Sequence, residues 1–435
     1  MGACALTSAR VRDGAVPKPY SETLKHPEVS TEIFFSAARD AISKDMTQNE
    51  GFDYLRACTL LALTSIQYGQ LGAMQQYLGQ FFTLAAMQRF YDEKHWRPNL
   101  SKVQLELRRR IYWCTYTLDI YTSAIWNCFL RSQEIHANVR YPGDSNEDWV
   151  TESPTESRGD KKGWLQGWNF ATDLYRILEH TLNKSRAKTF EHEDRRRVDS
   201  LLFQDTFSDE KVLNTILQLY YQLPSVFKET PPMTGDRAKD IFGFQAANIQ
   251  ATMQLVRMIL LSMEDGAGVE RKCEVASEVL SVFHTIPREY LRAISTPLIY
   301  HLGCIGSVLG SAVENGLSES QYHRVKNSLL SLADLLENLE TGLARAAGTS
   351  QNLRAQVDRI TQHMQANRRL PQPAAMPHPY TTNHDIPPLS IPSLTNGNYI
   401  MNGPADFHLP PELFGDWSWP MEAVPHNPYG YGNIE

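Results

Sequence analysis

The sequence predicts an all-α fold, a multi-helix bundle that ends in a disordered, proline-rich C-terminal tail. Apolar residues recur at alternating spacings of three and four over most of residues 1–369, which is the period of an amphipathic helix. Short turn signals separate these stretches, so consecutive helices should run antiparallel. Beyond residue 369 the chain holds more than half of its 24 prolines and no Lys or Arg, which indicates disorder.

The composition is that of a soluble protein with a large core, since 42% of the 435 residues are hydrophobic and 21% are charged. A net charge of −7 disfavours nucleic-acid binding by bulk electrostatics, although it allows a local basic patch. The best candidate for a membrane span, residues 298–313, is short and contains His301. We therefore expect a buried helix there and no membrane partner. Three small residues would let another helix approach it closely: Gly303, Gly306 and Gly310.

Residues 1–145 are predicted to form the first helical bundle. Residues 1–10 have the pattern of an interior helix rather than of a secretory signal, because the first basic residues follow the apolar ones. Further helices are expected at residues 29–45, 52–68, 73–91 and, as the central element, 100–130.

The central helix has the most specific start signal in the chain. Ser101 and Gln104 form a capping box, and Leu100 and Leu105 are placed to form its hydrophobic staple. One apolar stripe continues from there, which predicts a largely buried helix with other helices packed along it. The stripe consists of Leu107, Ile111, Cys114, Leu118, Tyr121, Ile125 and Cys128.

Charged residues on this helix have structural explanations. Asp119 lies among apolar neighbours, and a buried carboxylate requires a partner, so we expect a structural hydrogen bond or an Arg from another helix. Glu106 precedes Arg109 and Arg110 at helical spacing, which favours a partly neutralised face over a nucleic-acid patch.

The second helical part is predicted at residues 160–369, after an irregular polar loop at residues 138–160. The basic triplet at residues 195–197 is a weak nuclear import signal, because acidic residues precede it. Helices are expected at residues 164–178, 192–203, 209–221, 239–263, 269–283, 297–314, 322–343 and 351–365.

The helix at residues 322–343 allows two interpretations. Ser318 and Gln321 form a second capping box, and an apolar stripe of about three heptads follows. This stripe could be a dimer seam, but an intramolecular bundle helix is favoured because the rest of the chain is built of such helices. The stripe consists of Val325, Leu329, Leu332, Leu336, Leu339 and Leu343.

Four segments occur in a fixed order: Tyr54-Leu-Arg-Ala-Cys-Thr-Leu-Leu-Ala-Leu63, Tyr77-Leu-Gly79, Glu106-Leu-Arg-Arg-Arg-Ile-Tyr-Trp-Cys-Thr-Tyr-Thr-Leu-Asp119 and Tyr141-Pro142. Together they resemble the central regulatory domain of fungal zinc-cluster transcription factors. The resemblance is close over residues 1–141 and more diffuse up to residue 369.

This resemblance implies a nuclear regulator of RNA polymerase II transcription, acting on a metabolic or secondary-metabolite pathway. The domain would be a two-state bundle that restrains or permits activation, with a small-molecule inducer between its helices as one signal. Zinc-cluster factors commonly bind DNA as pairs, so a homodimer or heterodimer is a further expectation.

The DNA-binding module of that family is an N-terminal segment in which six closely spaced cysteines hold two zinc ions. We expect no zinc or other cofactor in this chain, because no two of its cysteines have the spacing of zinc ligands. DNA contact is expected only if a zinc cluster is encoded upstream of Met1, so the chain resembles a truncated factor or a paralogue without that module. The six cysteines have the contexts of small buried side chains: Cys4, Cys58, Cys114, Cys128, Cys273 and Cys304.

The tail, residues 370–435, interleaves acidic and aromatic residues around positions 406–419. This composition is typical of a transcriptional activation segment that contacts the transcription machinery, and a C-terminal arm docked on its own domain is the alternative.

No catalytic, cofactor-binding or metal site is predicted. The chain lacks an Asp-Asp-x-x-Asp run, a Gly-x-Ser-x-Gly elbow and a His-Glu-x-x-His motif, and His284, His301, His323 and His363 are isolated. An enzyme would need a deep pocket with paired acids, Asp119 among them. The main alternative to a transcription factor is a protein that does not bind DNA and modulates a full-length factor by pairing through residues 322–343.

Overall fold

The computed structural model describes residues 1–17, 31–48, 51–143, 163–189, 209–263, 268–310, 318–341 and 348–369. The predicted helix at residues 192–203, the basic triplet within it, most of the loop at 138–160 and the whole tail lie outside these residues. The described residues contain thirteen α-helices and no β-strand, which confirms the all-α prediction.

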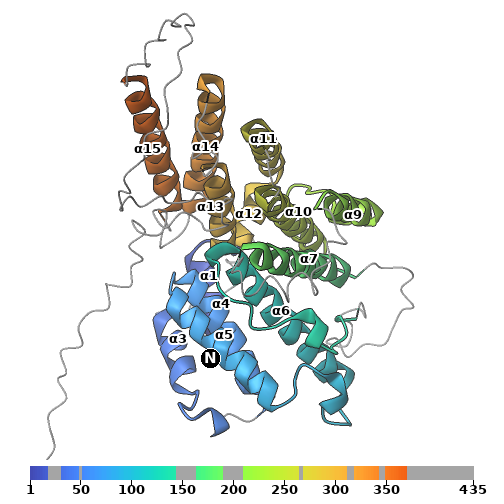
Figure 1. Ribbon diagram of the computed structural model, residues 1–435. Helices are drawn as coiled ribbons and strands as arrows, with labels where there is room; N and C mark the ends of the chain where they lie inside the picture. Colours follow the sequence, from blue (N-terminus) through green and yellow to red (C-terminus); the bar gives the residue numbers. More distant parts are fainter. Residues whose placement is uncertain are drawn as a thin grey trace, which may run out of the picture.

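The first five helices form the lower part of the molecule in Figure 1. Helices α4 and α5 form an antiparallel pair joined by a short turn, and α1 and α3 pack on the outer side of α4. Helix α6 lies against α4 and leads towards the rest of the chain. Their bounds are α1 Gly2–Arg12, α3 Thr31–Asp40, α4 Phe52–Gln67, α5 Leu71–Met87 and α6 Lys102–Trp126.

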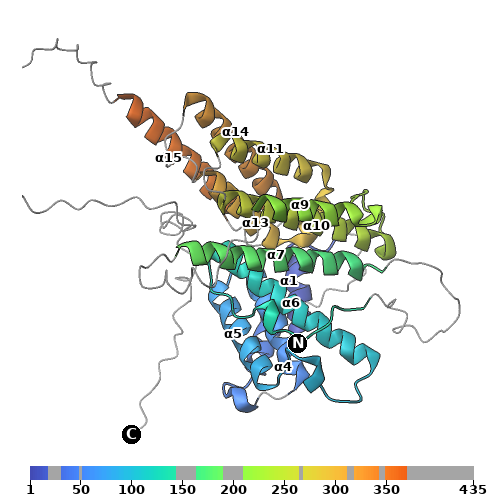
Figure 2. The same cartoon turned by 45° about the vertical axis from the view of Figure 1, so that its right-hand side comes forward.

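Helix α7 crosses the middle of the molecule between α6 and α10, and the later helices stack above it (Figures 1 and 2). Short 3-10 turns lie at Met46–Gln48, Glu93–His95, Glu134–His136 and Ser225–Phe227. The bounds of the later helices are α7 Leu165–Thr189, α9 Asp209–Gln222, α10 Arg237–Met263, α11 Val269–Thr285, α12 Arg288–Ile294, α13 Thr296–Gly310, α14 Glu319–Glu340 and α15 Thr349–Arg369.

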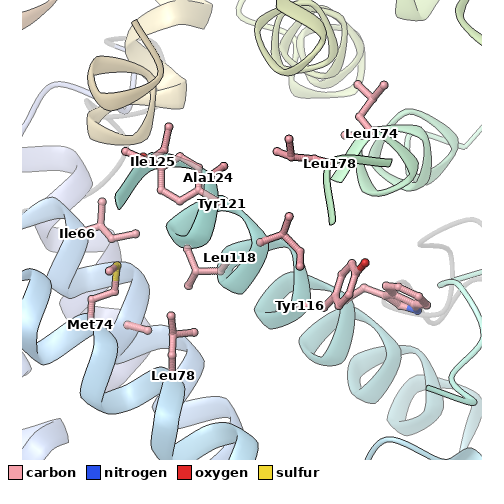
Figure 3. Close-up of a cluster of buried hydrophobic side chains, with 14 of the residues drawn as sticks. Ile66, Met74, Leu78, Tyr116, Leu118, Tyr121, Ala124, Ile125, Leu174 and Leu178 are labelled. Atoms are coloured by element: carbon pink, nitrogen blue, oxygen red, sulfur yellow. The ribbon is translucent and has the colours of Figure 1, made fainter. Parts of the chain in front are cut away.

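The buried apolar side chains form two cores. The first fills the space between α1, α4, α5, α6, α7, α9 and one face of α10. The second lies between the other face of α10 and helices α11 to α15. Because α7 contributes Leu174 and Leu178 to the first core, the two expected sequence regions, 1–145 and 160–369, share one core (Figure 3).

The small residues of α13 allow α15 to lie directly on it. A Cβ atom added at Gly306 would come within 2.6 Å of Leu353, and one added at Gly303 within 2.7 Å of Thr349. These distances are shorter than a normal van der Waals contact, so a larger residue at either position would force the side chain of Leu353 or Thr349 to move. The predicted close approach of another helix is therefore confirmed.

The apolar stripe of α14 is buried inside the chain. Val325, Leu329 and Leu336 have no exposed surface, and α11, α13 and α15 surround the helix. The capping box of Ser318 and Gln321 is present. The intramolecular interpretation of this stripe is confirmed, and its described apolar side chains are not available to a second chain in this conformation.

Several expectations about local structure were wrong. The helix expected at residues 29–45 ends at Asp40, and Cys114 and Cys128 are half-buried rather than buried. The central helix ends at Trp126, four residues early, because Asn127 adopts the left-handed conformation with φ of 50°. Cys128 thus lies in the following loop rather than in the stripe. Cys4 is exposed, because α1 turns Ala5 and Ala9 towards the core and Cys4 away from it.

Candidate functional site

Helix α6 is the element that positions the candidate site. Its capping box is present, with Gln104 N donating to Ser101 Oγ at 3.2 Å and Ser101 N donating to Gln104 Oε1 at 3.0 Å. Every residue from Leu118 to Ile125 is buried, which confirms a buried helix for its second half, whereas Leu107, Ile111 and Cys114 of the predicted stripe are half-buried. Around this half of α6 lies a group of polar side chains, which we call the α6–α7 junction: Tyr116, Asp119, Arg131, Glu179 and Arg186.

Asp119 is the centre of this junction and has no exposed surface. Arg131 donates from Nη1 to its Oδ1 at 2.8 Å and from its backbone N to Oδ2 at 2.8 Å, and Ser132 N adds a third bond at 3.2 Å. Burial raises the pKa of Asp119, and these hydrogen bonds oppose that shift. The predicted partner is thus an Arg, but it comes from the loop after the same helix rather than from another helix.

Glu179 of α7 is the second buried carboxylate of the junction. It accepts hydrogen bonds from Tyr116 Oη and, at 3.1 Å, from the backbone N of Glu134. Burial and the neighbouring carboxylate both raise the pKa of Tyr116, so its hydroxyl stays protonated as the donor. These bonds attach both α6 and the 127–143 loop to α7.

Arg186, at the far end of α7, holds the loop that follows α6. Its Nη2 atom donates to Cys128 O and to Ser123 Oγ, both at 2.8 Å. Carbonyl groups at a helix end have no partner within the helix, and a guanidinium group satisfies them well. The junction therefore connects the end of α6 to α7 at two places.

The three consecutive arginines of α6 all contact other side chains of the same chain. Arg109 binds both carboxylate oxygens of Glu93, at 2.7 and 2.9 Å, and Glu106 at 2.8 Å. The guanidinium of Arg108 lies 4.5 Å from the ring centre of Phe52, and that of Arg110 lies 5.5 Å from Trp164. The predicted neutralised face is confirmed for Arg109, and the two other arginines stack on aromatic rings.

The closing Tyr141-Pro142 segment is also anchored on α7. Tyr141 Oη donates to Asp173 Oδ1 at 2.6 Å and accepts from Arg176 Nη1 at 3.0 Å. Trp113 of α6 donates from its ring nitrogen to Arg140 O at 3.0 Å. The segments Glu106 to Asp119 and Tyr141-Pro142, which are separate in sequence, therefore meet on one face of α7.

The family model described as "Fungal specific transcription factor domain" matches residues 13–239, just over half of the chain. The chain belongs to this family. The matched residues include the entire α6–α7 junction. No curated protein and no solved structure matches the chain.

Membership of the fungal specific transcription factor domain family identifies the chain as a fungal transcription regulator in general terms, because the family is one of transcription factor domains and not of enzymes. Asp119, the acid that an enzyme would have needed, is paired with Arg131 in a structural role.

The four histidines that the sequence analysis considered lie outside the α6–α7 junction or outside the described side chains. His284 Nδ1 contacts Leu280 O at 2.6 Å, and His323 lies 3.8 Å from Glu319 on an exposed face. His301 is buried in α13 beside Tyr121, at 5.1 Å between ring centres. The side chain of His363 lies outside the described residues. Among the residues that the structure describes, no three His, Cys, Asp or Glu side chains are grouped to hold a metal ion.

Sequence reasoning missed Arg131, Glu179 and Arg186. Glu179 had a visible signal, because it follows Ile177 and Leu178 in an apolar helix, as Asp119 does in α6. Arg131 and Arg186 had none, since their roles depend on where the 127–143 loop folds.

Among the cavities lined by described residues are two between helices, with volumes of about 440 and about 270 Å³. The larger lies between the end of α5 and the first turns of α4 and α6, and the smaller between α11, α12 and α14. Within the described ranges, no helix alone has the length and apolar content of a membrane span; α12 and α13 reach them as a pair, at a bend of 95°.

Proposed function

We propose that this chain is the regulatory domain of a nuclear factor that controls RNA polymerase II transcription of a metabolic or secondary-metabolite pathway. The observation that carries this proposal is the family match over residues 13–239. The nuclear location and the pathway are the parts that go beyond the match.

The mechanism that we propose is a change in the equilibrium between two packings of the bundle. Helix α13 contributes Tyr300 and Cys304 to the first core and Leu298 and Leu302 to the second, so it couples the two. A ligand or partner that binds one packing more tightly shifts the equilibrium towards it.

We further propose that the acidic-aromatic segment at positions 406–419 is the surface that the transcription machinery contacts. Replacing Trp417 and Trp419 by Ala removes the two largest apolar groups of this segment and should reduce activation several-fold. Any contact with DNA is proposed to come from a zinc-cluster module, in this factor or in a dimer partner.

The alternative function, modulation of a full-length factor, has to use a surface other than the α14 stripe, because that stripe is buried in the chain. Exposed apolar side chains lie elsewhere, at Phe129 and Ile135 in the loop after α6 and at Tyr221 on α9.

The experiment that tests the proposal tethers the full chain to a heterologous DNA-binding domain upstream of a reporter gene in a fungal cell. We expect reporter output to change several-fold relative to the DNA-binding domain alone, in either direction. The Trp417→Ala, Trp419→Ala variant distinguishes activation by the tail from regulation by the helical domain. Unchanged output from a chain that is present in the nucleus would contradict the proposal.

A further inference from the structure

The cavity of about 440 Å³ is walled by aromatic rings that are held in place. The rings of Phe90 and Trp96 stack at 5.3 Å between centres, and Phe52 lies 5.9 Å from Phe90. Trp96 donates from its ring nitrogen to Phe90 O at 3.0 Å, which fixes the orientation of the indole. A cavity of this size and with this lining is of the kind that takes a small planar molecule.

Positively charged side chains line the same cavity. Arg97 and Arg108 line it, and no Asp or Glu does so among the described residues. His95 is also part of the lining, and its Nδ1 lies 2.9 Å from Asp92 Oδ2. Neither Arg97 nor Arg108 forms an ion pair within the part of the chain that the structure describes. Burial lowers the pKa of Arg108, the charge of Arg97 lowers it further, and the charge of Asp53 raises it.

Two guanidinium groups at the edge of an aromatic cavity are complementary to one class of small molecule. A carboxylate on an aromatic ring places its charge beside the arginines while its ring lies against the aromatic wall. Arginine binds carboxylates through two parallel hydrogen bonds, and an anion removes the repulsion between Arg97 and Arg108.

We propose that this cavity binds a small planar aromatic carboxylate, with its ring against Phe90 and Trp96 and its carboxylate bound by Arg97 and by Arg108, whose guanidinium also lies over the Phe52 ring. This names the chemical class of the inducer, and it rests on the proposed function only in calling the ligand an inducer. Residues of α4, α5 and α6 line the site. A ligand bound there therefore contacts α6, the helix that carries the α6–α7 junction.

The test measures binding of benzoate and 2-naphthoate to the full chain by isothermal titration calorimetry, each compared with its neutral amide. We expect at least one carboxylate to bind ten times or more tightly than its amide, because charge-assisted hydrogen bonds to arginine are lost with the charge. Equal binding of acid and amide, or no binding of either acid to the folded chain, would overturn the proposal.

Arg97→Gln and Arg108→Gln should each weaken carboxylate binding about tenfold and leave amide binding unchanged. Arg97 is exposed, so its replacement leaves the fold intact, as circular dichroism can verify. Arg56→Gln is the matched control, because Arg56 also lies over the Phe52 ring, at 5.7 Å, but does not line the cavity. If Arg56→Gln weakens binding as much as Arg97→Gln, the charge effect is general and the proposed site is wrong.

The proposed function and the proposed carboxylate site can be contradicted independently of each other. Carboxylate binding with this pattern, in a chain that leaves the tethered reporter unchanged, supports the site and contradicts the proposed function. A changed reporter in a chain that binds neither acid supports the proposed function and contradicts the site.

Discussion

The two least exposed carboxylates among the described residues lie on the two helices that meet at the centre of the molecule. Asp119 and Glu179 are both buried, and each is bound by groups from the loop after α6. A buried carboxylate without its partner is costly, so these contacts hold the loop in a single position.

We predict that Arg131→Ala lowers the free energy of unfolding by about 3–5 kcal/mol, because Asp119 then remains buried without its cation. The Asp119→Leu, Arg131→Met double variant should recover a large part of that loss, since it removes both charges together. Urea denaturation of the three proteins measures the effect. A loss below about 1 kcal/mol for Arg131→Ala would mean that Asp119 is satisfied by backbone amides alone.

His301 gives a prediction about pH. Burial lowers its pKa from 6.5 to about 3, so the folded protein keeps this ring neutral where the unfolded chain binds a proton. The contribution of His301 to stability is therefore present above pH 6.5 and is lost as pH falls towards 3, by up to about 1.4 kcal/mol per pH unit.

His301→Leu should remove this dependence, so the stability difference between variant and wild type should move in favour of the variant between pH 7 and pH 5. Chemical denaturation at both pH values measures it, and all other titrating groups are shared by the two proteins. An identical difference at pH 7 and pH 5 would show that the ring can take up a proton in the folded state.

At the scale of single helices, the sequence predicts most of what the structure contains. Capping boxes at Ser101 and Ser318 mark the starts of α6 and α14, because a cap is a local interaction between residues three apart. The end of α6 was placed too late because Cys128 continues the apolar period although Asn127 has already left the helix. Helix α12, Arg288–Ile294, was missed because seven residues are too few to show a period.

The glycines of two helices provide a matched test of helix packing. Gly306→Ala should destabilise the protein by about 1–3 kcal/mol, because the new methyl group overlaps Leu353 and comes within 3.1 Å of Leu332. Gly79→Ala in α5 should stabilise it by about 1 kcal/mol, because nothing lies within 4 Å of the added atom and Ala favours the helix. Thermal denaturation of both variants measures the pair; two shifts of the same sign would contradict the close packing of α13 and α15.

At the scale of the whole molecule, the division of the buried side chains into two cores could not be predicted from the sequence. Helix α10 faces both cores, with Ile249 and Val256 in the first and Ala247 and Met258 in the second. That division depends on which distant helices pack on each face of α10. For the same reason the junction and the aromatic cavity could not be predicted, since each brings together segments from three or more elements.

The helices nevertheless support one functional conclusion at this scale. The family match covers most of the first core and the whole junction, and the later helices α11 to α15 continue the same bundle through α10 and α13. The chain is a transcription regulator in general terms, and the mechanism that we propose for it is a change in how these helices pack.

The most direct test of this account is the transcript profile of a strain in which the gene is deleted, compared with its parent under the same conditions. We expect altered transcript levels in a limited set of genes that belong to one pathway, with restoration when the full chain is returned. An unchanged profile under conditions in which the parent strain makes the protein would contradict the conclusion that the chain regulates transcription.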